Sequence, residues 1–339
     1  MFHPALNLCS VLHGVAQLVL FSLIPYSAFA EGNPANDQPQ PESVSIQWMG
    51  EIESLQLDES SGLAGSNDWA DVLWSINDSG SGPELFAMTT RGKHLGIWPV
   101  AMADPVDWEA MASFRWQGQS YLLVADIGDN FGSRSVVSYT VILEPKLDEV
   151  PKAAIETVHT QAFVYPGGPR DAEAVAVDPQ RGEVLVLSKR TSPPELYRLP
   201  LILQSESADG SDAVIEAQLL AKLSGFSKPD KNQADLYGDF WPYLGMPTGM
   251  SLEADRLLVT TLDHAYVFDR GNLAAAPRRI ALPFIGQREA ITFASGSTTT
   301  AYVSQEREYG LRKANIFRLD FAPVPNSSQQ GTQAKQHDR

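Results

Sequence analysis

Four glutamates recur at the start of similar short segments, and these residues are the best candidates for chemistry. Glu59 precedes Ser-Ser-Gly-Leu-Ala, Glu109 precedes Ala-Met-Ala, Glu173 precedes Ala-Val-Ala-Val, and Glu289 precedes Ala-Ile-Thr-Phe. A fifth segment of this kind begins at Thr248 and lacks the acid. Carboxylates that a fold gathers in one place can bind a hard cation or act as acids and bases.

Each of these segments opens a longer repeat. A second apolar segment follows and ends in polar residues, at 72–78, 121–126, 184–189, 257–263 and 301–306. A third segment comes next, at 84–88, 138–143, 195–199, 264–268 and 315–319, and some copies add a fourth, at 94–100, 157–164 and 216–223. Short runs of Val, Ile, Leu, Tyr and Trp between Gly, Asp, Asn, Ser and Pro are typical of β-strands.

The repeat predicts an all-β fold, a β-propeller of about five blades with four antiparallel strands each. Six blades remain an alternative because the long insertion 225–246 has no assignment. A two-sheet sandwich is another alternative, although it gives no reason for a repeat that begins with an acid. The spare segment 44–51 is expected to complete the last sheet, which would join the chain ends and remove exposed sheet edges.

The first strand of each propeller blade lines the central channel, so the repeat predicts a ring of acids at one mouth of that channel. Its members are Glu59, Glu109, Glu173 and Glu289. The second strands run antiparallel to the first and return to the same mouth. They are expected to add Asn77, Asp78, Asp126, Asp263 and Glu306.

Such a ring needs compensation, because like charges repel and burial disfavours an ionised carboxylate. A bound cation is one solution, and oxygen ligands without cysteine suit calcium or magnesium. Internal ion pairs are the other. Arg170 and Arg288 closely precede two of the ring acids, and Lys189 and Arg190 stand where other repeats carry an acid. Both interpretations stay open from the sequence.

Two loops have the composition of a metal site or of a tight turn. Asp126-Ile-Gly-Asp129-Asn130, followed by Arg134, groups three oxygen-bearing side chains around a glycine. Calcium loops use such spacing, but Asp and Asn also bond their own backbone in turns. The loop that begins at Asn77 has the same ambiguity. The candidate metal ligands are therefore Glu59, Asp78, Glu109, Asp126, Asp129 and Asn130.

Aromatic residues near these acids suggest ligand contacts. Trp108 lies between Asp107 and Glu109, where it would stack on a sugar or ring ligand or else pack between blades. The insertion 225–246 is expected to form a lid, a ligand wall or a plug. It contains Tyr237, Asp239, Phe240, Trp241 and Tyr243.

The N-terminus predicts export. Residues 1–30 contain no Lys, Arg, Asp or Glu, and an apolar run from Val11 to Ile24 leads to Ala-Phe-Ala before Glu31. This pattern predicts a cleaved signal peptide and a periplasmic or secreted protein, with an uncleaved anchor as the alternative. We expect a flexible linker at 31–43, one propeller domain at 44–322 and a disordered tail at 323–339.

Composition excludes several classes of function. The net charge is −16 and no basic stripe is visible, which argues against nucleic acid and against anionic lipid. The single cysteine, Cys9, falls in the predicted signal, and no histidine pair has metal spacing, so neither a disulfide nor a zinc site is expected. No nucleotide or haem is expected. We predict a monomer that binds a small molecule or an exported protein, without membrane insertion after signal cleavage.

The motifs carry a resemblance. The segments that begin at Glu59, Asn77, Asp107 and Asp126 resemble those of secreted bacterial β-propeller proteins of unassigned function, over about residues 50–321. More distantly the chain is similar to the gluconolactonase, regucalcin and paraoxonase propellers. That resemblance implies a catalytic divalent cation in the channel, with Glu59 matching a glutamate ligand. The Asn ligands of those propellers have no clear counterpart here.

Two functions follow as hypotheses, and the sequence leaves open whether the protein is an enzyme. The first is an exported propeller that binds a ligand or partner at the acidic mouth, with or without a divalent cation. The alternative is a metal-dependent hydrolase of lactones or other esters. In that case the cation polarises a carbonyl or activates water, and a ring carboxylate acts as the base.

Overall fold

The computed structural model describes residues 44–148, 153–204, 213–283, 286–307 and 313–321. The predicted signal peptide, linker and tail lie outside the described residues. Within the described part of the chain, no helix has the length and apolarity needed to cross a membrane.

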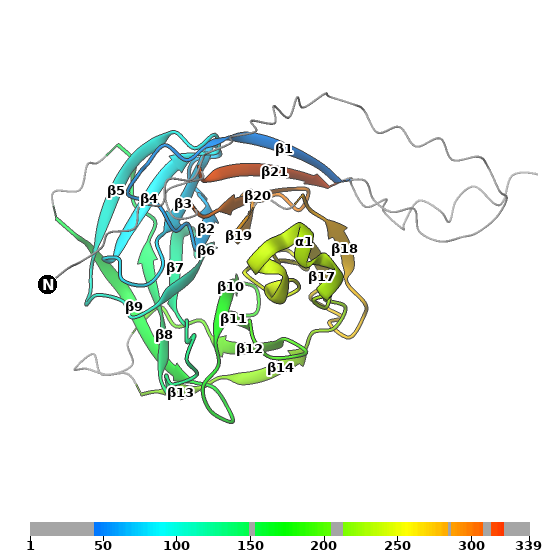
Figure 1. Ribbon diagram of the computed structural model, residues 1–339. Coiled ribbons are helices and arrows are strands. Elements are labelled where there is room, and N and C mark those ends of the chain that lie inside the picture. The colour runs from blue at the N-terminus through cyan, green and yellow to red at the C-terminus, as the bar shows by residue number, and fades with distance from the viewer. Residues whose placement is uncertain (1–43, 149–152, 205–212, 284–285, 308–312, 322–339) are drawn as a thin grey trace, which may run out of the picture. The chain divides into compact units, whose positions relative to one another are not determined.

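The strands form antiparallel sheets of four that follow one another along the chain (Figure 1). The first blade contains β2 (Gly62–Gly65), β3 (Val72–Ile76), β4 (Glu84–Thr89) and β5 (His94–Ala101). The second contains β6 (Trp108–Trp116), β7 (Gln119–Asp126), β8 (Val137–Leu143) and β9 (Ile155–Val164). The third contains β10 (Ala172–Asp178), β11 (Glu183–Ser188), β12 (Glu195–Pro200) and β14 (Gln218–Lys222).

Two further blades complete the ring. The fourth contains β15 (Gly249–Glu253), β16 (Arg256–Thr260), β17 (His264–Asp269) and β18 (Arg278–Ala281). The fifth contains β19 (Arg288–Phe293), β20 (Thr300–Gln305), β21 (Asn315–Phe321) and β1 (Val44–Glu51). The innermost strands contact each other in a closed cycle, β2 with β6, β6 with β10, β10 with β15, β15 with β19, and β19 with β2. The predicted five-blade propeller is therefore confirmed, and the sandwich and six-blade alternatives are not.

The N-terminal strand closes the ring. Strand β1 pairs antiparallel with β21, in a register that runs from Val44 opposite Phe321 to Glu51 opposite Asn315. This pairing confirms the sequence prediction for 44–51. It gives the last blade its fourth strand and covers an edge that would otherwise expose unpaired backbone groups.

The outer strands of the first two blades are joined, which the sequence did not predict. The end of β5 pairs in parallel with the start of β9, Val100 opposite Ile155 and Ala101 opposite Glu156. The short strand β13 (Ile215–Glu216) adds to the other end of β9. These contacts link the first and second blades into one continuous sheet.

Apolar clusters fill the spaces between neighbouring blades. Between the first and second blades the cluster contains Trp74, Trp98 and Trp108 with smaller aliphatic side chains. The rings of Trp74 and Trp98 meet edge to face, with centroids 5.2 Å apart. Full burial of a large apolar side chain contributes roughly 1.5–3 kcal/mol, so these clusters hold the blades in fixed positions around the channel.

The insertion between the third and fourth blades is helical. It contains the short helices η1 (Lys231–Gln233), α1 (Ala234–Tyr237) and η2 (Gly238–Tyr243). In Figure 1 it lies in front of the middle of the ring, close to β17. The backbone of Ser227 donates to the Tyr266 hydroxyl at 2.9 Å, which ties the start of the insertion to the fourth blade.

Candidate functional site

Three of the repeating glutamates meet at one mouth of the channel. Glu109, Glu173 and Glu289 line a cavity of about 330 Å³, which we call the acidic cavity. Each is the second residue of an innermost strand, β6, β10 or β19, and each is at most 8 % exposed. Asp78 and Glu306, which follow β3 and β20, add two more carboxylates. The remaining lining residues are Asn130, Lys189, Arg190, Phe240, Tyr243, Thr248, Leu262 and Gln287.

A β-bulge places each of these three glutamates. The register of β6 with β7 shifts at Glu109, between Trp108 and Ala110. The same shift occurs at Glu173 in β10 and at Glu289 in β19. A bulge inserts one residue that has no partner opposite and changes the direction of its side chain. The repeated bulge is therefore the local device that brings three glutamates into one cavity.

The two other copies of the repeat differ. Strand β2 begins at Gly62, three residues after Glu59, and it pairs with β3 without a register shift. Glu59 is exposed and does not line the acidic cavity, although partial desolvation and the charges of Asp78 and Asp58 raise its pKa. In the fourth blade Thr248 takes the place of the acid and donates to the backbone oxygen of Arg288 at 2.7 Å.

One lysine compensates part of the negative charge. Lys189 follows β11, and its Nζ forms an ion pair with Glu173 inside the cavity. Burial opposes the charge on Lys189, but Glu173 and Glu289 together raise its pKa. Arg190 is directed to Asp171 and to the side-chain oxygen of Asn130. The internal-pairing interpretation therefore holds for Glu173, while the other acids of the cavity need further compensation.

Burial and the neighbouring negative charges raise the pKa values of several acids in the cavity. Burial, together with the charges of Glu289 and Asp78, raises the pKa of Glu306 to about 10. Burial and the charge of Glu289 raise the pKa of Glu173 to about 8, even beside Lys189. Burial, Glu173 and Asp78 raise the pKa of Glu109 well above its usual range. The cavity is thus a place where a cation could displace protons.

Three carboxylates form a tight group at the margin of this cavity. Asp78, Asp107 and Glu109 each offer an oxygen, and these oxygens all lie within 4.8 Å of one another. Burial and the neighbouring Asp78 raise the pKa of Asp107 to about 7. Its Oδ1 is buried and has no hydrogen-bond partner among the described residues. We call this group the acidic triad.

The loop that begins at Asp126 supports the triad from behind. A Cβ atom added at Gly128 would lie 2.3 Å from Asp107 Oδ2 and 2.6 Å from Glu109 Oε1. Only glycine therefore leaves room for both carboxylates. Asp126 accepts hydrogen bonds from the backbone of Val106 at 2.9 Å and of Asp107 at 3.0 Å, and so fixes the strand start that carries the triad.

The carboxylates of this loop are engaged in turns and ion pairs. Asp126 also accepts from Arg134 at 2.5 Å. Asp129 accepts from the backbone of Ser133 at 2.8 Å and of Arg134 at 2.9 Å. The turn interpretation of this motif thus fits the structure better than the metal-loop interpretation. Asp126 and Asp129 position the site, whereas Asn130 reaches the cavity itself.

Three residues expected at the mouth have structural roles instead. Trp108 is only 1 % exposed and packs in the core between the first and second blades, so its ring cannot stack on a ligand. Arg170 pairs with Glu195 at 2.9 Å. Arg288 is buried and donates to the backbone oxygens of Leu262 at 2.7 Å and Pro283 at 2.6 Å. None of the three lines the acidic cavity.

The polar residues predicted at the ends of the second strands also fall into two groups, those that line the cavity and those with structural contacts. Asp78 and Glu306 line the acidic cavity. Asn77 instead caps the preceding loop, with its Oδ1 3.2 Å from the backbone nitrogen of Glu59. Asp263 lies 2.9 Å from His264 Nδ1 and accepts from the Thr261 hydroxyl at 3.0 Å. From the insertion, Phe240 and Tyr243 complete the wall of the acidic cavity, a position that fits a lid, a ligand wall or a plug.

Comparison with known proteins gives only distant likenesses. No family model matches the sequence, and no curated protein matches it. Among solved structures, a chain of a nidogen–laminin complex shares 16 % identity over 72 % of this chain and 71 % of its own, with a TM-score of 0.39. The PQQ-bound aldose sugar dehydrogenase from Streptomyces coelicolor shares 11 % identity over 83 % and 99 %, with a TM-score of 0.42.

A luciferin-regenerating enzyme shares 8 % identity, over 83 % of this chain and 98 % of its own, with a TM-score of 0.41. At such values these likenesses concern the fold at most and do not bear on activity. The propeller architecture rests on the strand pairing of this chain.

Proposed function

We propose that this chain is an exported ligand-binding propeller whose acidic cavity binds a divalent cation at the triad of Asp78, Asp107 and Glu109. The observation that carries the proposal is the placement of three carboxylate oxygens within 4.8 Å of one another. Gly128 supports the assignment, because a larger residue there would displace two of the three ligands. Hard oxygen ligands suit calcium or magnesium.

A cation also resolves the electrostatic conflict in the cavity. Five carboxylates line it, and the described ion pairs give the ammonium group of Lys189 to Glu173. Glu173 Oε2 is buried without a hydrogen-bond partner, which leaves an acceptor for a ligand or for water held near the cation. A bound cation with unfilled coordination positions can then bind a small ligand beside Phe240 and Tyr243. Alternatively, an exported protein partner binds at the acidic mouth of the channel.

The test is elemental analysis together with thermal melting of the full chain in EDTA, calcium and magnesium. We expect one divalent ion per chain, and a rise in Tm with the ion that Glu109→Gln abolishes. Glu253→Gln is the matched control, because Glu253 lies at the far end of β15, outside the acidic cavity. Protein without a divalent ion, and with the same Tm in all three conditions, would contradict the proposal.

A second candidate is hydrolysis of lactones or other esters at the same cation. The observation that favours it is Glu173, which lines the same cavity outside the triad and whose pKa burial and the charge of Glu289 raise to about 8. Carboxylates that titrate near neutral pH suit general base catalysis. Turnover of a γ-lactone or a nitrophenyl ester with calcium, lost in Glu173→Gln, would support it. Absence of turnover with every divalent ion would exclude it.

Export is part of the proposal and has its own test. It is supported by the uncharged, apolar N-terminus that ends in Ala-Phe-Ala. Mass spectrometry of protein from the periplasm or medium of a bacterial host should give a chain that starts at Glu31. A full-length chain retained in the cytoplasm would contradict export.

A further inference from the structure

A second cavity, unlike the first, lies beside the base of the insertion. It has a volume of about 470 Å³, within the usual size range of small-molecule pockets. None of its sixteen lining residues is Asp or Glu, and Lys189, Arg190 and Lys228 are basic. The whole chain contains 41 acidic and 25 basic residues, so this absence of acids is not a reflection of composition. We call this cavity the insertion pocket.

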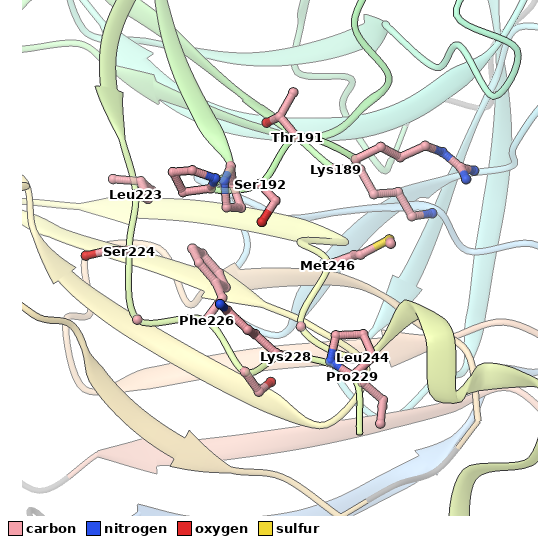
Figure 2. A pocket seen from close by; sticks show the side chains of 16 residues that line it. Lys189, Thr191, Ser192, Leu223, Ser224, Phe226, Lys228, Pro229, Leu244 and Met246 are labelled. Carbon is pink, nitrogen blue, oxygen red and sulfur yellow. The ribbon is translucent and has the colours of Figure 1, made fainter. Parts of the chain in front are cut away.

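Three segments of the chain build the walls of the insertion pocket. They are the loop 189–194 after β11, the segment 223–229 after β14, and residues 244–246 at the end of the insertion. Figure 2 shows the ring of Phe226 and the hydroxyl of Ser192 facing the space between these segments. The Phe226 ring is held rigidly, with its centroid 4.6 Å from that of Tyr266. Leu223, Pro193, Pro194, Pro229, Leu244 and Met246 supply further apolar surface.

The basic side chains of this pocket differ in whether they already form ion pairs. The ammonium of Lys189 is paired with Glu173 in the acidic cavity, and in Figure 2 its side chain runs past Met246. Arg190 bonds Asp171 and Asn130. Lys228, by contrast, forms no ion pair with any described residue. The hydroxyl of Ser192 likewise donates no hydrogen bond within the described part of the chain.

We infer that the insertion pocket binds a small organic anion, a carboxylate with an aromatic or branched apolar body. The apolar body would pack on Phe226 and Met246. The carboxylate would pair with Lys228 and accept a hydrogen bond from the free hydroxyl of Ser192. The absence of any acid among the described residues of the lining argues against an apolar cation, and a bare inorganic anion would leave the apolar walls unused. This inference does not depend on the cation proposed for the triad.

Titration with 1-naphthoate, a fluorescent aromatic carboxylate, tests the inference on the full chain in EDTA. We expect saturable binding at one site. Reversing the charge in Lys228→Glu should weaken it about tenfold or more, because a like charge would then face the carboxylate. Met246→Trp should abolish it by filling the pocket. Lys231→Glu is the matched control, since it makes the same charge change on η1, outside the pocket, and should bind as the wild type does.

Two further measurements use a neutral analogue of the ligand and a variant of the triad. The neutral analogue 1-naphthalenemethanol should bind clearly more weakly than 1-naphthoate, and Asp107→Asn, which removes a triad ligand, should leave naphthoate binding unchanged. Cation binding therefore tests the triad, and naphthoate binding independently tests the insertion pocket. The inference is overturned if 1-naphthoate does not bind, if Lys228→Glu and Lys231→Glu bind it equally, or if the neutral analogue binds as tightly.

Discussion

The acidic cavity and the insertion pocket share a wall and have opposite character. Lys189 and Arg190 line both, yet among the described residues five carboxylates line the first cavity and none lines the second. The difference arises from where the two cationic groups go. Lys189 pairs with Glu173 and Arg190 with Asp171, so both charges are drawn toward the acids. Neighbouring cavities can thus differ in charge although they are built in part from the same residues.

Removal of Lys189 should disturb this arrangement most. Lys189→Met deletes the buried counter-ion and leaves Glu173 beside other acids, so we expect a loss of about 3 kcal/mol in the free energy of unfolding at pH 8. The loss should shrink at pH 6, because the pKa of Glu173 is raised and its protonation removes the charge that Lys189 compensates. Urea denaturation at both pH values measures it. Lys313→Met removes an exposed pair with Glu51 and should change little. Equal losses of stability in Lys189→Met and Lys313→Met would contradict a special role for the buried lysine.

Filling the space behind the triad should affect only the acidic cavity. Gly128→Ala places a Cβ 2.3 Å from Asp107 Oδ2 and 2.6 Å from Glu109 Oε1. We expect calcium affinity, measured by calorimetry, to fall about a hundredfold, which corresponds to about 2.7 kcal/mol. Gly82→Ala is the control, because a Cβ there has no atom within 4 Å and no unusual backbone angle. Unchanged affinity in Gly128→Ala would argue against the triad, as would naphthoate binding that falls with it.

The raised pKa values predict how stability depends on pH. Glu173 and Glu306 have folded-state pKa values of about 8 and about 10, above the value of 4.5 expected for an unfolded chain. The folded state therefore binds more protons, and the free energy of unfolding in EDTA should fall as pH rises from about 5 to 9. Glu306→Gln should reduce the slope by up to about 1.4 kcal/mol per pH unit. A slope that calcium does not flatten, or that rises with pH, would contradict this account.

A smaller effect is expected at the edge of the insertion pocket. Gly245 has φ +80°, and a Cβ there would lie 1.9 Å from the backbone oxygen of Ser227. Gly167 has nearly the same φ, +81°, with no atom closer than 3.6 Å. An alanine at either position has the same strained backbone angle. The difference in stability between the two variants therefore measures the steric clash with the backbone oxygen of Ser227. We expect Gly245→Ala to lose about 1 kcal/mol more stability and to weaken naphthoate binding, while calcium binding stays the same. Equal melting temperatures would show that the insertion adapts freely.

The repeat in the sequence was sufficient to predict the fold and much of the acidic cavity. A glutamate at the start of an innermost strand must approach the channel, and Glu109, Glu173 and Glu289 do so. Lys189 was also identified as a counter-charge from its position in the repeat. Glu59 departs from this pattern because β2 begins later and has no bulge. A bulge depends on strand register, which no local motif in this sequence encodes.

Other features depend on contacts between distant segments. Asp107 was visible two residues before Glu109, but its place in the triad depends on Asp78 from another blade. The motif that begins at Asp126 allowed either a metal loop or a tight turn, and the contacts show that its glycine makes room while its carboxylates hold the backbone. The insertion pocket joins three segments that share no repeat or motif. The signal to look for was the absence of acids in 189–194 and 223–229.

The most direct test of the central claim is a crystal structure of the full chain with manganese in place of calcium or magnesium, with the ion located by its anomalous signal. The account predicts one peak in the acidic cavity, about 2.0–2.6 Å from oxygens of Asp78, Asp107 and Glu109. A peak elsewhere, or no peak in the acidic cavity at saturating manganese, would contradict it.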